Sequence, residues 1–248
     1  MKPIYATLLL AAALAAAGTC RAQNADFGIW TDIGAEKKIN KKWSVEAETS
    51  LRTRDNTSKI DRWSIGAGTD YRIARWLKVG AGYDLLLDRR ETSLSYHADG
   101  SVNKITPEFS QLRHRLHADL TASFKAGRFG FSLRERYQYT LRPTSHNRRY
   151  DTDTGDWSDM KSKSSHISRT RLNIEYNIRH CPLTPGIGGE LFCGKGGVQK
   201  YRLTVGTDIK VDKHNVFTLC YRFQDVTTTD DDGNDNMHIL GVGYTHKF

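Results

Sequence analysis

The chain has 248 residues, 38% of them hydrophobic, and its 37 Lys and Arg against 28 Asp and Glu give a formal charge of +9. After the N-terminal segment, no stretch approaches the ~18 consecutive apolar residues of a transmembrane helix, which excludes a helical membrane protein. The basic residues are spread along the whole chain, which argues against a nucleic-acid-binding protein.

Residues 1–22 are typical of a secretory signal peptide. Lys2 precedes an apolar run from Leu8 to Ala17, and small residues follow it up to Ala22. Because this run is too short to span a bilayer, we expect cleavage after Ala22 and export of residues 23–248 as one domain. The exported cysteines are odd in number, so at most one pair among Cys181, Cys193 and Cys220 can form a disulfide, and the sequence does not decide which.

Eleven segments of the exported part alternate apolar and polar residues with the period of two that is typical of β-strands. Most are longer than the roughly five or six residues usual in globular sheets and match the ~9 to 11 that cross a membrane obliquely. In chain order the segments are 26–37, 42–54, 62–73, 76–88, 110–125, 129–141, 166–179, 185–194, 201–211, 217–223 and 237–248.

One face of these segments is charged, and the other is apolar with aromatic residues toward its ends. In a soluble sandwich the apolar face would need large interdigitating side chains, yet its rows contain many alanines. A lipid-facing band with aromatic girdles around a polar lumen fits better, so we predict an all-β transmembrane barrel. The charged residues predicted to line its lumen are Arg52, Arg72, Arg113, Arg115, Arg134, Arg136, Arg169, Arg171, Arg202, Arg222, Glu46, Glu48, Asp70, Asp84, Asp119, Glu175 and Asp208.

The connections alternate in length, as they do when short turns lie in the periplasm and longer loops lie outside the cell. Short turns are expected at 38–41, 74–75, 126–128 and 212–215, and long loops at 88–109, 142–165 and 227–236. Because bacterial barrels have an even number of antiparallel strands, we expect about twelve strands, with ten as the alternative. The expected location is the outer membrane of a Gram-negative bacterium.

The C-terminal segment is typical of a barrel assembly signal. Leu240, Val242, Tyr244 and Phe248 share one face of the last predicted strand, and Phe248 ends the chain. We therefore expect the barrel assembly machinery to be one partner, and outer-membrane lipid with lipopolysaccharide to be the other.

Several short motifs resemble a known family. They are Asp26-Phe27-Gly28-Ile29-Trp30, Lys42-Trp43-Ser44-Val45-Glu46, Arg169-Thr170-Arg171-Leu172, Gly188-Gly189-Glu190-Leu191-Phe192, Tyr201-Arg202-Leu203-Thr204-Val205-Gly206 and the final eight residues. The chain is similar in these motifs to the bacterial outer-membrane proteins grouped as domain of unknown function 2490. The resemblance implies an outer-membrane barrel and no established activity.

Two classes of function follow from these predictions. In the favoured one, the protein is structural or a narrow, charge-lined and largely plugged channel, in which Arg169, Arg171, Glu175 and Glu190 could pair across strands. The alternative is a membrane-embedded hydrolase acting on lipid or surface peptide. We find that less convincing, because His166 with Ser164 and Ser168 is the closest approach to a nucleophile and base, at a loop edge.

No cofactor or metal site is expected. The aspartate-rich stretches 151–156 and 230–236 are similar to calcium loops, but position twelve counted from Asp151 is Ser162 rather than Glu. An omptin-like protease would need His and carboxylates on the outer loops, and His97, His146, Asp151, Asp153 and Asp156 supply these types without a fixed spacing. We interpret both regions as solvated loops.

Overall fold

A computed structural model describes residues 25–227 and 236–248. The predicted signal peptide and most of the 230–236 stretch lie outside the described residues. These residues form fifteen strands, and none of their helices is long and apolar enough to cross a membrane. The strands are β1 (Asp26–Lys38), β2 (Trp43–Arg54), β3 (Lys59–Arg72), β4 (Leu77–Arg90), β5 (Ser93–Tyr96), β6 (Val102–Thr106), β7 (Phe109–Ala126), β8 (Phe129–Arg142), β9 (Ser145–Asp151), β10 (Trp157–Met160), β11 (Lys163–Tyr176), β12 (Leu183–Gly194), β13 (Gly197–Lys210), β14 (Asn215–Val226) and β15 (Met237–Lys247).

Eleven of these strands form a closed barrel in the order β1-β15-β14-β13-β12-β11-β8-β7-β4-β3-β2. The predicted all-β barrel is therefore confirmed, and each of the eleven predicted segments corresponds to one barrel strand. The expected even number is corrected to eleven, because β1 closes the barrel by pairing parallel to β15, with Asp26 opposite Met237. An even count follows only if every pair is antiparallel, and this pair is not.

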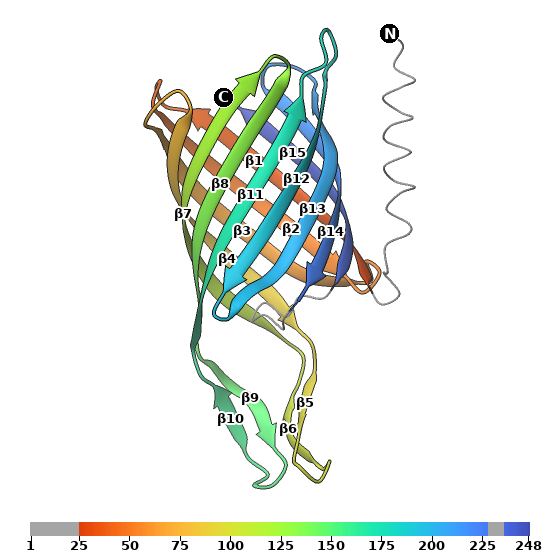
Figure 1. The fold of residues 1–248 in the computed structure, drawn as a ribbon. Coiled ribbons are helices and arrows are strands. Elements are labelled where there is room, and N and C mark those ends of the chain that lie inside the picture. The colour runs from red at the N-terminus through yellow and green to blue at the C-terminus, as the bar shows by residue number, and fades with distance from the viewer. Residues whose placement is uncertain (1–24, 228–235) are drawn as a thin grey trace.

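The remaining strands form a second sheet that projects beyond one end of the barrel (Figure 1). Its order is β10-β9-β6-β5, and it is built from two hairpins inserted between β4 and β7 and between β8 and β11. These hairpins lie in the expected long loops 88–109 and 142–165, where no strand was predicted. We call the end that carries them the loop end, and the opposite end, where the C-terminus lies, the turn end (Figure 1).

Two rings of aromatic side chains delimit the apolar wall. At the turn end, Phe124 stacks on Phe131 at 4.7 Å and Phe129 lies 5.0 Å from Tyr176, ring centre to ring centre. Toward the loop end, three tyrosine hydroxyls contact Nδ1 of a histidine on the neighbouring strand at 2.5–2.6 Å, in the pairs Tyr83–His114, Tyr137–His166 and Tyr221–His238. On β7 and β11 the histidine precedes the turn-end aromatic, Phe124 or Tyr176, by ten residues. For tilted strands this corresponds to ~25 Å, the height of the apolar band of a membrane barrel.

Candidate functional site: the barrel lumen

The lumen differs between its two halves. In the half nearest the loop end, large inward side chains are buried, with exposed fractions of 0–6%. We call this group the loop-side plug: Arg62, Asp88, Gln111, Arg113, Phe192, Lys200, Gln224, Met237 and Ile239. It combines an apolar contact of Met237 and Ile239 with Trp30 and a charged cluster in which Arg62 and Arg113 both bind Asp88. Polar and apolar side chains are therefore packed together inside the barrel on this side.

In the half of the lumen nearest the turn end, glycines at inward positions leave space unfilled. Inward positions on several strands there are occupied by glycine rather than by a side chain, as at Gly66, Gly68 and Gly80. A methyl group at Gly66 or Gly80 would collide with the carboxylate of Asp84 or Asp70 respectively. The space left open holds a cavity of about 300 Å³ and an adjoining one of about 170 Å³ that share Glu46, Arg134, Arg136 and Arg171 in their walls.

Most acidic side chains lie on one side of these cavities and most arginines on the other, with Arg52 on β2, Lys78 on β4 and Asp119 on β7 as exceptions. The acids Asp32, Glu46, Glu48, Asp70 and Asp84 come from β1 to β4. The arginines come mainly from β7, β8, β11, β13 and β14, namely Arg115, Arg134, Arg136, Arg169, Arg171, Arg202 and Arg222. Since β1–β4 form one arc of the barrel and β7–β14 the other, a solute in the cavity lies between an acidic wall and an arginine wall. Such an arrangement creates a field across the lumen.

Glu190 lies on β12, between two strands of the arginine wall, and neutralises part of its charge. Its carboxylate is 3% exposed and accepts hydrogen bonds from Arg169 at 2.8 Å and Arg202 at 3.0 Å, and Arg171 Nε lies 3.1 Å away. Register explains the convergence: Arg171 is directly opposite Glu190 on β11, and Arg202 is directly opposite it on β13. Arg202 also donates to Gln224 at 2.7 Å, which ties this cluster to the loop-side plug.

Asp119 and Trp30 hold further members of the arginine set. Asp119 accepts two hydrogen bonds from Arg136, at 2.5 and 2.9 Å, and lies 3.0 Å from His117 Nδ1. The guanidinium groups of Arg52 and Arg202 lie 4.1 and 4.8 Å from the ring centre of Trp30, within the range of a cation–π interaction.

Among the described residues, three acids of the other wall lack an ionic partner, whereas Asp70 accepts a hydrogen bond from Lys78 at 2.7 Å. Across residues 25–227 and 236–248, Asp32, Glu46 and Glu48 make no ion pair with a basic side chain within 4 Å. Glu46 and Glu48 are also exposed although they point into the barrel, so water reaches them inside the lumen. The cavity is therefore accessible to solvent, with unpaired carboxylates opposite a partly paired arginine wall.

The structure brings together thirteen of the seventeen predicted lumen residues. Eleven line the larger cavity, and Asp70 and Asp119 line the adjoining one. The other four lie elsewhere: Arg113 is in the loop-side plug, Glu175 lines a separate cavity of about 310 Å³ at the turn-end mouth, Asp208 accepts a hydrogen bond from Thr218 at 2.7 Å, and Arg72 is exposed at the turn-end rim.

Sequence reasoning missed Asp32, Trp30 and the buried glutamines. Asp32 has the same parity as Trp30 and Gly34 on β1, so alternation could have found it. Gln111, Gln138 and Gln224 are uncharged, and their burial depends on which strands face one another, a signal that the pattern of one strand does not carry.

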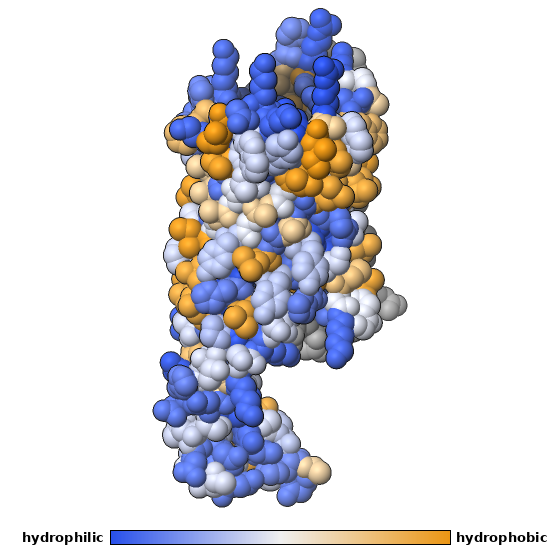
Figure 2. Space-filling model, turned by 90° about the vertical axis from the view of Figure 1, so that its left-hand side faces the viewer, coloured by the Kyte–Doolittle hydropathy of each residue, from blue (hydrophilic) through white to orange (hydrophobic). Residues whose placement is uncertain are grey.

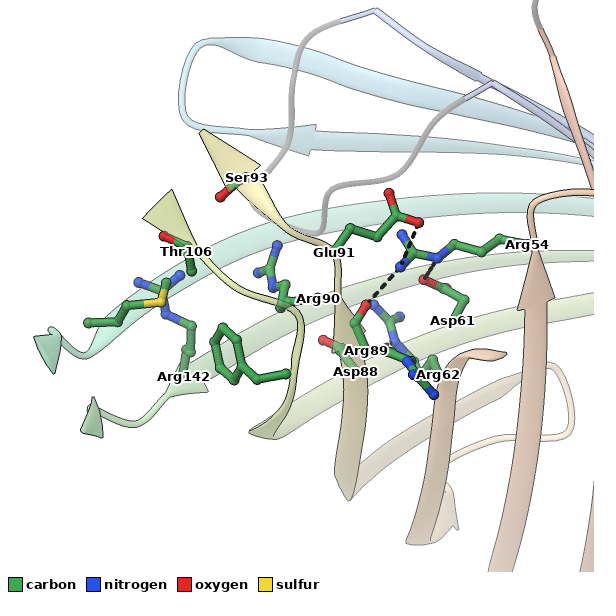
Figure 3. Close-up of a pocket in the computed structure, with 12 residues that line it drawn as sticks. Arg54, Asp61, Arg62, Asp88, Arg89, Arg90, Glu91, Ser93, Thr106 and Arg142 are labelled. Carbon is green, nitrogen blue, oxygen red and sulfur yellow. Dashed lines mark hydrogen bonds and ion pairs between the residues drawn. The ribbon is translucent and has the colours of Figure 1, made fainter. Parts of the chain in front are cut away.

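A smaller pocket of about 170 Å³ lies beyond the plug at the loop end (Figure 3). Arg54 contacts Asp61 at 3.8 Å and Glu91 at 3.4 Å there, and Arg62 with Asp88 forms its floor against the plug. Because Arg62 and Asp88 bound both this pocket and the plug, the plug separates it from the larger cavity.

The lipid-facing wall carries polar groups where a hydrolase would need them, but they are engaged otherwise. His166 Nδ1 contacts Tyr137 Oη at 2.6 Å, and Ser168 donates to Glu135, which also accepts from Thr170 at 2.6 Å. In the described part of the chain, no serine is hydrogen-bonded to His166, so no nucleophile–base pair is formed there. Cys181, Cys193 and Cys220 are all free thiols.

One solved structure shares the barrel fold. The β-domain of the Bordetella autotransporter BrkA is similar with a TM-score of 0.52 and 10% identity, covering 82% of this chain and 79% of that one. The NanC porin is similar with a TM-score of 0.47 and 12% identity, covering 85% and 91%. No curated protein matches the sequence. Residues 27–235 match the family described as protein of unknown function (DUF2490), so the chain belongs to this family of barrel proteins, as the sequence motifs predicted.

Proposed function

We propose that this outer-membrane barrel is a narrow gated channel that admits small solutes bearing an anionic group from its turn end and is closed at its loop end in the state described. The observation that carries the proposal is the solvent-accessible cavity between the arginine wall and the unpaired carboxylates of Asp32, Glu46 and Glu48. A purely structural barrel would need pairing of its lumenal charges, whereas here Asp32, Glu46 and Glu48 face water.

The arginine wall fits a carboxylate, phosphate or sulfate group. Guanidinium groups present several donors in one plane and bind such oxyanions through paired hydrogen bonds. Arg222 and Arg134 are candidates for first contact, because neither is within hydrogen-bond distance of a carboxylate in the described residues; Arg134 lies 3.9 Å from Glu190. The opposite acids would repel simple dianions and favour solutes that also carry a cationic or hydroxyl group.

Planar-bilayer recording tests this proposal. We expect the unmodified protein to show no steady conductance, since Phe192 and Ile239 are 5% and 0% exposed in the plug. The double variant Phe192→Ala/Ile239→Ala should open a current whose reversal potential in a KCl gradient shows anion preference. The matched control is Leu191→Ala/Leu240→Ala, which truncates the outward neighbours on the same two strands and should conduct no more than the unmodified protein.

Two outcomes would contradict the proposal. A large steady conductance of the unmodified protein would mean an open porin. A folded Phe192→Ala/Ile239→Ala variant without current would mean that the plug is not the barrier. Release of fatty acid from lipid by the purified barrel would instead favour the hydrolase, for which the contacts of His166 and Ser168 give no support.

A further inference from the structure

The turn end carries a concentration of cations on its outer rim. Turns 38–43 and 72–76, with the strand ends beside them, hold six exposed basic residues, which we call the basic patch: Lys37, Lys38, Lys41, Lys42, Arg72 and Arg75. The two turns are neighbours, because Trp43 pairs with Tyr71 across β2 and β3 and the Arg72 amide donates to the Lys42 carbonyl at 2.8 Å. Separate stretches of sequence thus form one cationic surface.

Almost nothing on this surface compensates its charge. Between residues 36 and 43 and between 71 and 76 the single acid is Glu36, whose carboxylate lies 3.8 Å from Lys247 on β15. At the loop end, by contrast, Arg54 and Arg89 have the acidic partners Asp61, Glu91 and Glu108. The charge imbalance is therefore a property of these two turns rather than of the whole surface.

Aromatic side chains fix the height of the basic patch relative to the membrane. Trp43 is outward on β2 and 45% exposed, Trp76 in the neighbouring turn is 58% exposed, and Trp43 lies 4.9 Å from Tyr71, ring centre to ring centre. Exposed tryptophan and tyrosine at the end of an apolar wall mark the boundary between acyl chains and headgroups. Lys42 lies just beyond them, with Nζ 3.5 Å from Tyr71 Oη and 5.8 Å from its ring centre. The cations therefore lie at headgroup height, and Figure 2 shows hydrophilic side chains standing out beyond the hydrophobic surface at this end.

We propose that the basic patch binds the phosphate headgroup of an anionic phospholipid in the leaflet at the turn end. Clustered Lys and Arg beside an apolar surface attract acidic lipids, each cation adding to the affinity. The ligand is a lipid rather than a free phosphate because the aromatic side chains below the cations offer a place for the glycerol and upper acyl chains. This inference concerns the outer surface and is independent of the proposed channel.

The test uses the folded full-length protein in nanodiscs of phosphatidylcholine with increasing fractions of phosphatidylglycerol, with bound lipid counted by native mass spectrometry. We expect preferential retention of phosphatidylglycerol, lost at high salt. Lys38→Gln/Lys41→Gln should lower the apparent affinity about thirtyfold. Neither side chain makes a hydrogen bond or ion pair within the described residues, so the fold should survive. The matched control Lys161→Gln/Lys195→Gln removes two exposed lysines at the loop end and should leave the affinity unchanged.

Three results would overturn the inference. Equal retention of phosphatidylglycerol by the patch variant and the unmodified protein would place the lipid elsewhere. An equal loss in the control variant would mean a response to net charge alone. The site would bind a soluble anion instead if inorganic phosphate displaced phosphatidylglycerol at low millimolar concentration. The same conclusion would follow if phosphate bound to the protein in nanodiscs of pure phosphatidylcholine as tightly as phosphatidylglycerol binds.

Discussion

Replacing Glu190 by Gln should destabilise the barrel more than any other single neutralisation of a lumenal acid. The carboxylate is 3% exposed and is shared by Arg169, Arg171 and Arg202 at 2.8–3.1 Å. Removing one partner of a buried ion pair costs ~3–5 kcal/mol, because the other charge stays buried. Gln keeps the shape and one acceptor oxygen, so we expect a loss near the lower end, about 3 kcal/mol.

The assay is urea unfolding in detergent micelles, read as the fraction that keeps the mobility of the folded barrel in unheated gel samples. Glu46→Gln is the matched control, because Glu46 is also lumenal but exposed and makes no ion pair in the described residues. Its unfolding free energy should change by no more than ~0.5 kcal/mol. Equal midpoints for the two variants would refute the idea that Glu190 anchors the arginine wall.

Three further predictions address facing, pH and assembly. Leu203→Asp places a charge on the lipid face in the middle of β13 and should lower stability by up to ~2 kcal/mol, whereas lumenal Thr204→Asp should be tolerated; equal effects in urea unfolding would mean that the facing is wrong. In the projecting sheet, backbone amides and a neighbouring side chain hold the pKa of two carboxyls below the usual value of 3.8; the side chain is Lys104 for Asp151 and His146 for Asp159. The stability that these carboxylates give to the sheet is therefore complete above pH 3.8 and is lost as the pH falls below it. The protection factors of β9 and β10, which are exchange rates corrected for the intrinsic pH dependence of amide exchange, should be lower near pH 3 than at pH 6, and equal protection factors at the two pH values would contradict this. Deleting Phe248, which is 67% exposed, should leave the thermal stability of the purified barrel nearly unchanged but cause precursor to accumulate in cells; normal levels of folded barrel would remove the role of the C-terminal segment in assembly.

Strand existence and facing could be predicted because they depend on local alternation. Leu240 and Val242 point outward and Arg169 and Arg171 point inward for the same reason, the period of two along one strand. Closure could not be predicted in this way, since the parallel pairing of β1 with β15 joins residues about 210 apart. The projecting sheet was missed because its strands span only four to seven residues within polar loops.

The division of the lumen into plug and cavity is also a non-local property. The burial of Gln224 and the exposure of Glu48 depend on which side chains lie at the same height across the barrel. The register between strands that are distant in the sequence sets these heights. The separation of acidic from basic side chains could be predicted in part from the sequence. Glu46, Asp70 and Asp84 all lie in the first four barrel strands, although only the ring order shows that these strands form one wall.

The central claim, a cavity open at the turn end and closed at the loop end, is tested most directly by thiol accessibility in proteoliposomes. Single cysteines are introduced at Glu48 in the cavity, Lys41 at the turn end and Ser93 at the loop end, in a chain whose native cysteines are replaced by serine. A membrane-impermeant maleimide should label Glu48→Cys from the side that labels Lys41→Cys and not from the side that labels Ser93→Cys. Labelling of Glu48→Cys at equal rates from both sides would contradict the account.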